Sequence, residues 1–171
     1  MVAPFCTVLL TVEKKGETIL SRLEDSPYRK YFRVGEEIKI PEHPHMQEVP
    51  YPALFLVGKD VPASPGFRIA TFAITEPFEM VSHTHTHDFD QYLSFYGCAP
   101  DMLELGGEIE FAIGEEEGAL ETFVFTEPFM VHIPPGVRHC PLRYTKVYDP
   151  AKPMIHQDLV FTGEYIRRPA T

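Results

Sequence analysis

Residues 82–91 read Ser82-His83-Thr84-His85-Thr86-His87-Asp88-Phe89-Asp90-Gln91. Side chains two positions apart on a β-strand point to the same face of the sheet. If the stretch is extended, the three histidines therefore form a row on one face, and the two threonines between them lie on the other. Neutral imidazole is the commonest protein ligand for transition metals, and imidazoles from alternate strand positions can share one ion. A single histidine in a strand is usually a surface or hydrogen-bonded residue, but three in strict alternation favour a metal site.

A second stretch, Pro134-Pro135-Gly136-Val137-Arg138-His139, combines a turn with another histidine. Pro135 and Gly136 suit the two central positions of a type II turn, because proline fixes φ at the first and glycine accepts a positive φ at the second. The turn sets where the following strand begins, and His139 comes just after it. This histidine supplies the third imidazole that a metal site needs. Cys140 follows directly, so strand alternation predicts that its thiol points away from the metal.

The rest of the chain predicts an all-β protein. Period-2 alternation and runs of β-branched or aromatic residues dominate, and turn clusters separate them at close intervals, as in a sandwich or barrel. Ser26-Pro27 is the one fair helix start, for a helix of a turn or two. The predicted strands are Thr7–Val12, Leu54–Val57, Phe67–Ile74, Phe78–His87, Gln91–Tyr96, Glu108–Ile113, Leu120–Phe125, Phe129–Ile133, His139–Val147 and His156–Phe161.

Two motifs in this order resemble those of the cupin superfamily. The first is His85-x-His87-x3-Gln91, followed by Gly106-Gly107-Glu108 at the start of a strand, and the second is Pro134-x-Gly136-x2-His139. The resemblance covers roughly residues 66–162. It implies a double-stranded β-helix, or jelly-roll barrel, with one divalent metal ion held inside it. The implied ligands are His85, His87, Gln91 and His139, and Gln91 stands where cupins usually have a glutamate, so the site would be neutral.

A competing register of the first motif stays open. His83-x-His85-x4-Asp90 meets another common cupin spacing and restores an acidic ligand. The register with His85, His87 and Gln91 is preferred, because related cupins often read His-Asp-x-Asp-Glu at the positions of residues 87–91. In that pattern the ligand Glu stands at the position of Gln91. His83 would then lie one step along the same face, as a candidate acid or base beside the metal.

These residues favour a metal-dependent enzyme acting on a small molecule. Three histidines and one weak amide ligand leave coordination positions open, as oxygenases and Lewis-acid enzymes require. We expect a mononuclear non-haem dioxygenase-like activity on an anionic, chelating substrate, with Fe(II) favoured and Mn, Ni or Zn possible. The alternatives are a cupin isomerase or epimerase of sugars, and a non-catalytic module that binds a small ligand.

Composition restricts the partners of the chain. Its 171 residues carry a formal net charge of −10, and so acidic a domain repels nucleic acid and anionic lipid. No window approaches the roughly 18 apolar residues that span a bilayer, and no signal peptide is evident. Three distant cysteines form neither a disulfide framework nor a CxxC pair, so a cytoplasmic protein is expected.

The domain organisation follows from these patterns. We expect one cupin domain over residues 1–171, with residues 1–65 as an N-terminal extension packed on the barrel and residues 66–162 as the barrel core. The extension begins with a strand-like segment over residues 5–12 that has no obvious place in an eight-stranded jelly roll. Because exposed edge strands pair readily, this segment predicts a homodimer built on added or exchanged strands.

Overall fold

The structure is a computed structural model that describes residues 24, 26–40, 45–50, 53–60, 66–98, 100–115 and 119–169. The chain divides into two compact units, Met1–Phe32 and Arg33–Thr171. In the first unit, the short helix predicted after Ser26 is a single 3-10 turn, η1 (Arg29–Tyr31), and the amide of Arg29 donates to the carbonyl of Ser26. The predicted strand Thr7–Val12 lies outside the described residues.

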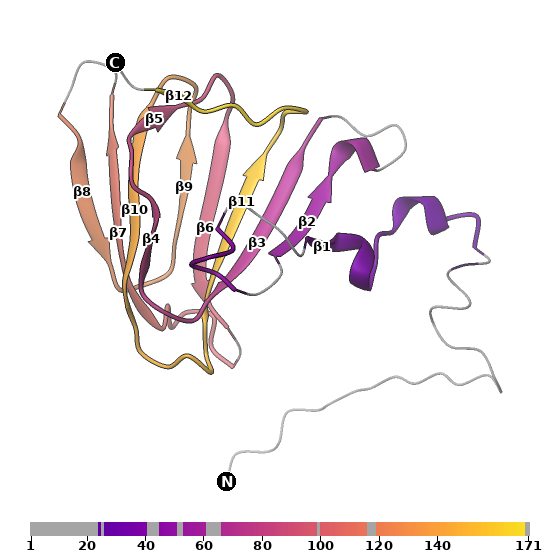
Figure 1. The fold of residues 1–171 in the computed structure, drawn as a ribbon, viewed down its shortest axis with the longest axis horizontal. Coiled ribbons are helices and arrows are strands. Elements are labelled where there is room, and N and C mark those ends of the chain that lie inside the picture. The colour runs from indigo at the N-terminus through magenta and orange to yellow at the C-terminus, as the bar shows by residue number, and fades with distance from the viewer. Residues whose placement is uncertain are drawn as a thin grey trace, which may run out of the picture. The chain divides into compact units, whose positions relative to one another are not determined.

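The described part of the second unit is built from two antiparallel sheets, which Figure 1 shows as arrows. The first sheet has the order β1 (Lys39–Ile40), β2 (Ala53–Val57), β3 (Arg68–Ile74), β11 (Met154–Val160), β6 (Gln91–Gly97) and β9 (Phe129–Ile133). The second has the order β12 (Arg168–Pro169), β5 (His85–Thr86), β10 (Arg138–Val147), β7 (Gly107–Gly114) and β8 (Glu121–Phe125), and β4 (Phe78–Val81) also pairs with β10. Two 3-10 turns precede the barrel strands, η2 (Gly35–Ile38) and η3 (Gly58–Asp60). None of the helical segments in the described ranges has the length and apolar character needed to cross a membrane.

The strand order is that of a jelly roll. Counting β3 as the first barrel strand and β4 with β5 together as the second, the first sheet runs 1-8-3-6 and the second runs 2-7-4-5. Two interlocked Greek keys give this alternation of early and late strands. The predicted all-β, cupin-type jelly roll is therefore confirmed. β1 and β2 extend the first sheet beyond β3, whereas the single domain predicted over residues 1–171 stays a prediction.

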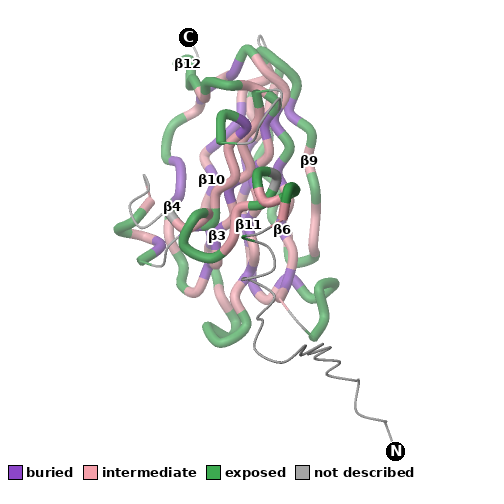
Figure 2. The backbone as a smooth tube through the Cα atoms, turned by 90° about the vertical axis from the view of Figure 1, so that its right-hand side faces the viewer, coloured by how far each residue is buried: buried purple, intermediate pink, exposed green. Residues whose placement is uncertain are grey.

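Alternating side chains on the inner faces of both sheets form the core. Along β3, β6 and β11 every second residue is buried, as expected for strands with one face on a core and one toward solvent. Figure 2 shows buried segments within the strands and mostly exposed loops at their ends. The largest fully buried side chains include Phe95, Phe111, Tyr144, Ile74 and Met154.

One predicted strand is interrupted. Residues 78–87 form β4 and the two-residue β5, and residues 82–84 between them are outside any strand. β4 and β5 both pair with β10, so the chain still runs alongside β10 across the break. The period-2 alternation expected for the whole histidine row holds only from His85 onward.

Candidate metal centre

Three of the four predicted ligands lie together inside the barrel. His85 of β5 is the direct cross-strand partner of His139 of β10, and neighbours of this kind share a face of the sheet. Their ring centroids are 4.3 Å apart, and the His87 ring is 4.9 Å from that of His85 and 5.1 Å from that of His139. One ring nitrogen of each lies within 4.8 Å of the other two, and all three side chains are buried.

The turn before His139 joins the two histidine stretches. The amide of Val137 donates to the carbonyl of Pro134 over 3.2 Å, and Gly136 has φ +83°, as the predicted type II turn requires. The amide of Gly136 also donates to the carbonyl of His87 over 2.9 Å. The turn therefore holds His87 and the start of β10 in a fixed relation, although they are 51 positions apart in the sequence.

Backbone carbonyls set the tautomer of each histidine. The Nδ1 atoms of His85, His87 and His139 lie 3.2, 2.6 and 3.1 Å from the carbonyl oxygens of residues 83, 166 and 137, respectively. Because a carbonyl oxygen only accepts, each Nδ1 carries the proton and each Nε2 keeps its lone pair. The Nε2 atom of His87 is buried and has no hydrogen-bond partner among the described residues. This is the arrangement of imidazoles that are oriented to bind a metal through Nε2.

Burial also keeps these imidazoles uncharged. Desolvation, followed by the repulsion of neighbouring His139, lowers the pKa of His85 to about 3. Desolvation likewise lowers the pKa of His139 to about 4, and it lowers the pKa of His87. Since a protonated imidazole cannot bind a metal, the low pKa values keep all three ligands available at neutral pH.

Gln91 offers a fourth, neutral oxygen. Its Nε2 donates to Oδ1 of Asp158 and to the hydroxyl of Tyr165, both over 3.0 Å. Its Oε1 is buried and has no hydrogen-bond partner among the described residues. Three neutral imidazoles with converging nitrogens and one orphaned amide oxygen fit a divalent transition metal ion. Coordination by Gln91 itself stays a prediction.

His83 and Asp90, the residues of the competing register, lie elsewhere. His83 is exposed, and its ring centroid is 5.6 Å from that of His85, because residues 82–84 leave the strand. Asp90 accepts a hydrogen bond of 2.6 Å from Nε2 of His132 on the surface. The metal-binding group found among the described residues contains neither of them. The acid or base role of His83 stays a prediction.

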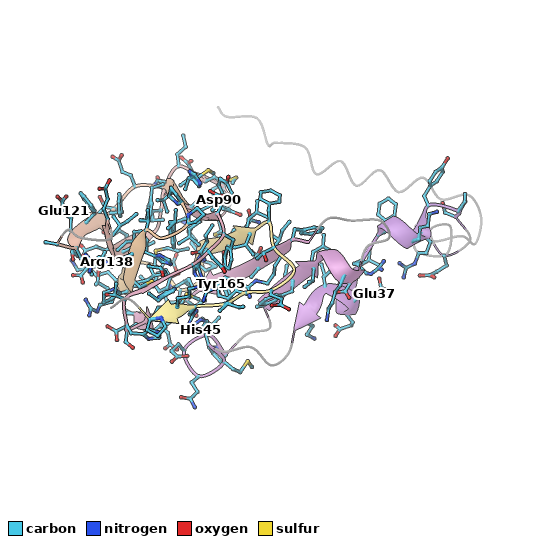
Figure 3. All side chains as sticks on the ribbon, turned by 90° about the horizontal axis from the view of Figure 1, so that it is seen from above. Glu37, His45, Asp90, Glu121, Arg138 and Tyr165 are labelled. Atoms are coloured by element: carbon cyan, nitrogen blue, oxygen red, sulfur yellow. The ribbon has the colours of Figure 1, made fainter. Side chains whose placement is uncertain are left out.

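A cavity of about 370 Å³ opens beside the histidines. Its walls are mostly apolar, and its polar side chains come from five separate parts of the sequence. Those polar side chains are His45, Arg68, His85, Gln91, His139, His156, Asp158, Tyr165 and Arg167. In the view of Figure 3, Tyr165 lies between the two sheets, whereas Glu121 lies at the outer edge. The size and mixed lining are typical of a site for a small molecule.

An ion pair supports the polar end of this cavity. Nη2 of Arg68 lies 3.0 Å from Oδ2 of Asp158, and the Arg68 guanidinium stacks 3.7 Å from the centroid of the Tyr165 ring. Burial raises the pKa of Asp158, and the adjacent Arg68 opposes this shift. Sequence reasoning missed these residues. Asp158 had a usable signal, since it is a polar residue in phase with the buried Met154 and Val160 of β11.

Cys140 does not point away from the cavity as predicted, but lines it. The residue has φ +71°, and the pairing of β10 with β7 shifts register between His139 and Leu142. Such a bulge breaks the alternation on which the prediction depended. Burial raises the pKa of the Cys140 thiol to about 12, so the thiol is protonated at neutral pH in the metal-free protein, and the metal-binding group found among the described residues does not include it.

The described strands form a jelly roll, and three histidines lie together inside it. No family model and no curated protein matches this chain. Among solved structures, it is similar to oxalate decarboxylase from Bacillus subtilis. A deletion mutant of that enzyme is 12% identical, with a TM-score of 0.48 over 69% of this chain and 27% of the enzyme. The structure at pH 4.6 is also 12% identical, with a TM-score of 0.47 over 67% and 26%. The chain spans about a quarter of the length of those proteins.

Proposed function

We propose that this protein is a metal-dependent enzyme that acts on an anionic, chelating small molecule, with a mononuclear non-haem dioxygenase as the reaction class. The observation that carries the proposal is the neutral donor set, of which His85, His139 and Gln91 line the cavity. His85, His87 and His139 are uncharged, and Gln91 stands where a charged ligand would otherwise be. A divalent ion held by these residues keeps its full positive charge toward the cavity.

The charges around the cavity favour the same class of substrate. Arg167 lines the cavity and is close enough to lower the pKa values of His85 and His139 electrostatically. Arg68 lines it too, and its Nε atom is buried without a hydrogen-bond partner among the described residues. An enolate, a catecholate or a hydroxy-keto acid presents two oxygens to a metal and a negative charge to an arginine. We therefore favour substrates of this kind over neutral sugars.

The ion proposed is Fe(II), with Mn, Ni or Zn as alternatives. When bound, such an ion supplies Lewis acidity and, in the case of iron, the capacity to react with dioxygen. The protein's part is positional. Asp158 and Tyr165 hold the Gln91 amide, apolar walls exclude water from the bound substrate, and the arginines orient its anionic group. His83, which is exposed beside His85, is proposed to carry protons.

Metal analysis combined with oxygen uptake tests the proposal. Untagged protein is analysed for metal, then loaded anaerobically with Fe(II) and mixed with a panel of catechols and hydroxy-keto acids in an oxygen electrode. We expect one ion per chain and oxygen consumption with at least one compound. His139→Ala should abolish both, and Asp90→Ala, a change at the surface, should leave both intact. Protein that binds metal but converts an epimerisable sugar without consuming oxygen would instead be an isomerase.

A further inference from the structure

His156 is a buried polar residue of the cavity that the metal centre does not use. Its side chain is 4% exposed, and it lies on the inner face of β11, two positions before Asp158. Its Nδ1 atom is 2.7 Å from the Tyr144 hydroxyl. Its Nε2 atom is buried and has no hydrogen-bond partner among the residues that the structure describes, although the side chain lines the cavity.

Aromatic neighbours hold the imidazole in place. The Phe95 ring stacks on it with centroids 4.6 Å apart, and the Phe72 ring lies 5.6 Å away on a tilted plane. Phe95 and Phe72 are also the cross-strand partners of His156 in β6 and β3. The ring faces are thus covered by apolar groups, and the polar edge that remains is the one at Nε2.

The Tyr144 hydroxyl fixes which nitrogen carries the proton. It has two acceptors within reach, Nδ1 of His156 at 2.7 Å and Sδ of Met80 at 3.7 Å. The imidazole nitrogen is nearer, and a thioether sulfur is a weak acceptor, so the hydroxyl donates to Nδ1. Burial lowers the pKa of His156 to about 3 and raises that of Tyr144, so both groups stay neutral. Nε2 consequently carries an N–H that has no acceptor among the described residues, and an unpaired donor is costly in a buried site.

His156 lies apart from the metal centre in the lining of the cavity. Near the metal centre, Gln91 donates to Asp158 of β11. His156 is two residues along β11 from Asp158, or about 7 Å at the rise of an extended strand. His45 also lines the cavity. Apolar side chains line the wall, including Leu93 and Leu142.

From this arrangement we infer that His156 is a substrate-binding residue, whose Nε2–H donates to an oxygen at the end of the substrate remote from the metal. The substrate class is a molecule about the size of one aromatic ring, with an anionic chelating head and a hydroxyl or carbonyl oxygen at the far side of an apolar body. The inference rests on the proposed function, because the metal centre positions the head.

Two hydroxamate probes test this inference in Zn(II)-loaded protein, which binds without turnover. 4-Hydroxybenzohydroxamate and 4-methylbenzohydroxamate have the same chelating head and nearly the same shape, and only the first has a distal oxygen. Their dissociation constants are measured by calorimetry. In the wild type we expect the hydroxyl probe to bind about five- to tenfold more tightly, the worth of one net hydrogen bond.

Substitution assigns the preference to His156. His156→Phe keeps a flat ring between Phe95 and Phe72 but has no donor, and it should abolish the preference or reverse it. Tyr144→Phe leaves His156 in place but frees its tautomer, and it should reduce the preference part of the way. An equal preference in the wild type and in His156→Phe would overturn the inference.

The measurement on the wild type tests the inference even if a variant fails to fold. A buried hydroxyl without a partner weakens binding, so a preference for the methyl probe in the wild type would overturn the inference by itself. Failure of the proposed function gives a different result. In that case neither probe binds, or both bind equally well to Zn(II)-treated His139→Ala protein, because the head is then not held by the metal centre.

Discussion

Acidification of the metal-free protein is expected to destabilise it through its buried histidines. The pKa values of His85 and His156 are lowered to about 3 and that of His139 to about 4, against 6.5 for a histidine in the unfolded chain. The folded state therefore binds fewer protons than the unfolded state below pH 6.5. The stability from these neutral histidines is fully present above pH 6.5 and is lost as the pH falls toward the folded pKa values.

The size of the loss follows from these pKa values. At pH 5.5 each histidine that protonates only on unfolding costs about 1.4 kcal/mol of unfolding free energy, so the three together cost about 4 kcal/mol relative to pH 7.5. That is a large fraction of the roughly 5–15 kcal/mol that stabilises a typical domain. Burial raises the pKa of Asp158, which acts in the opposite direction and adds stability as the pH falls.

Urea unfolding of chelator-treated protein at pH 7.5 and 5.5 measures this loss. Circular dichroism and tyrosine fluorescence are suitable signals, since the chain has eight tyrosines and no tryptophan. The variant His156→Phe isolates the contribution of one histidine. Between pH 7.5 and pH 5.5 its unfolding free energy should fall by about 1.4 kcal/mol less than that of the wild type, because it lacks His156 and the contribution of Asp158 is the same in both proteins. Equal losses in the two proteins would refute the assignment of His156 as a neutral buried group.

Three further predictions concern the ligands and the assembly. His87→Ala should lose the metal and Asp90→Ala should retain it, as measured by elemental analysis. His83→Ala should retain the metal but slow turnover. Loss of metal in Asp90→Ala and its retention in His87→Ala would support the competing register instead. Gln91→Glu should tighten the binding of Zn(II) in a chelator competition, most clearly when it is combined with Asp158→Asn. Nε2 of Gln91 donates to Asp158 over 3.0 Å, so the single variant would place the new carboxylate at position 91 about that close to the Asp158 carboxylate, and the two would repel each other. Light scattering at micromolar concentration should give the mass of a homodimer, and a monomer would remove the role predicted for the N-terminal strand.

The fold could be predicted because period-2 alternation is a local signal. The strand patterns and the Pro135-Gly136 turn each depend on neighbours within a few residues, and the structure has the jelly roll that they imply. The prediction was wrong where a strand is irregular. The alternation that placed His83 in one row with His85 does not survive the break at residues 82–84, and the bulge after His139 turns Cys140 inward.

Most of the rest of the site, Asp158 excepted, could not be predicted because it comes from contacts distant in sequence. Tyr165 and Arg167 follow the last long strand and show no periodic pattern, yet both line the cavity. Arg68 is 90 positions from its partner Asp158. A sequence pattern identifies residues that share one strand, but the pairing of β11 with both β3 and β6 decides which strands surround the cavity.

The segment after β11 completes the orientation of the ligands. His87 lies just beyond the two-residue β5, and a strand this short fixes a side chain weakly. The carbonyl of Ile166 accepts from Nδ1 of His87, and the Tyr165 hydroxyl accepts from Gln91. β12 pairs with β5, as Figure 1 shows at one end of the barrel, and Arg168 forms an ion pair of 2.6 Å with Asp88. Partners of this kind fix the tautomer and direction of a metal ligand. Two of the four proposed ligands, His87 and Gln91, thus owe part of their orientation to residues that follow the last barrel strand.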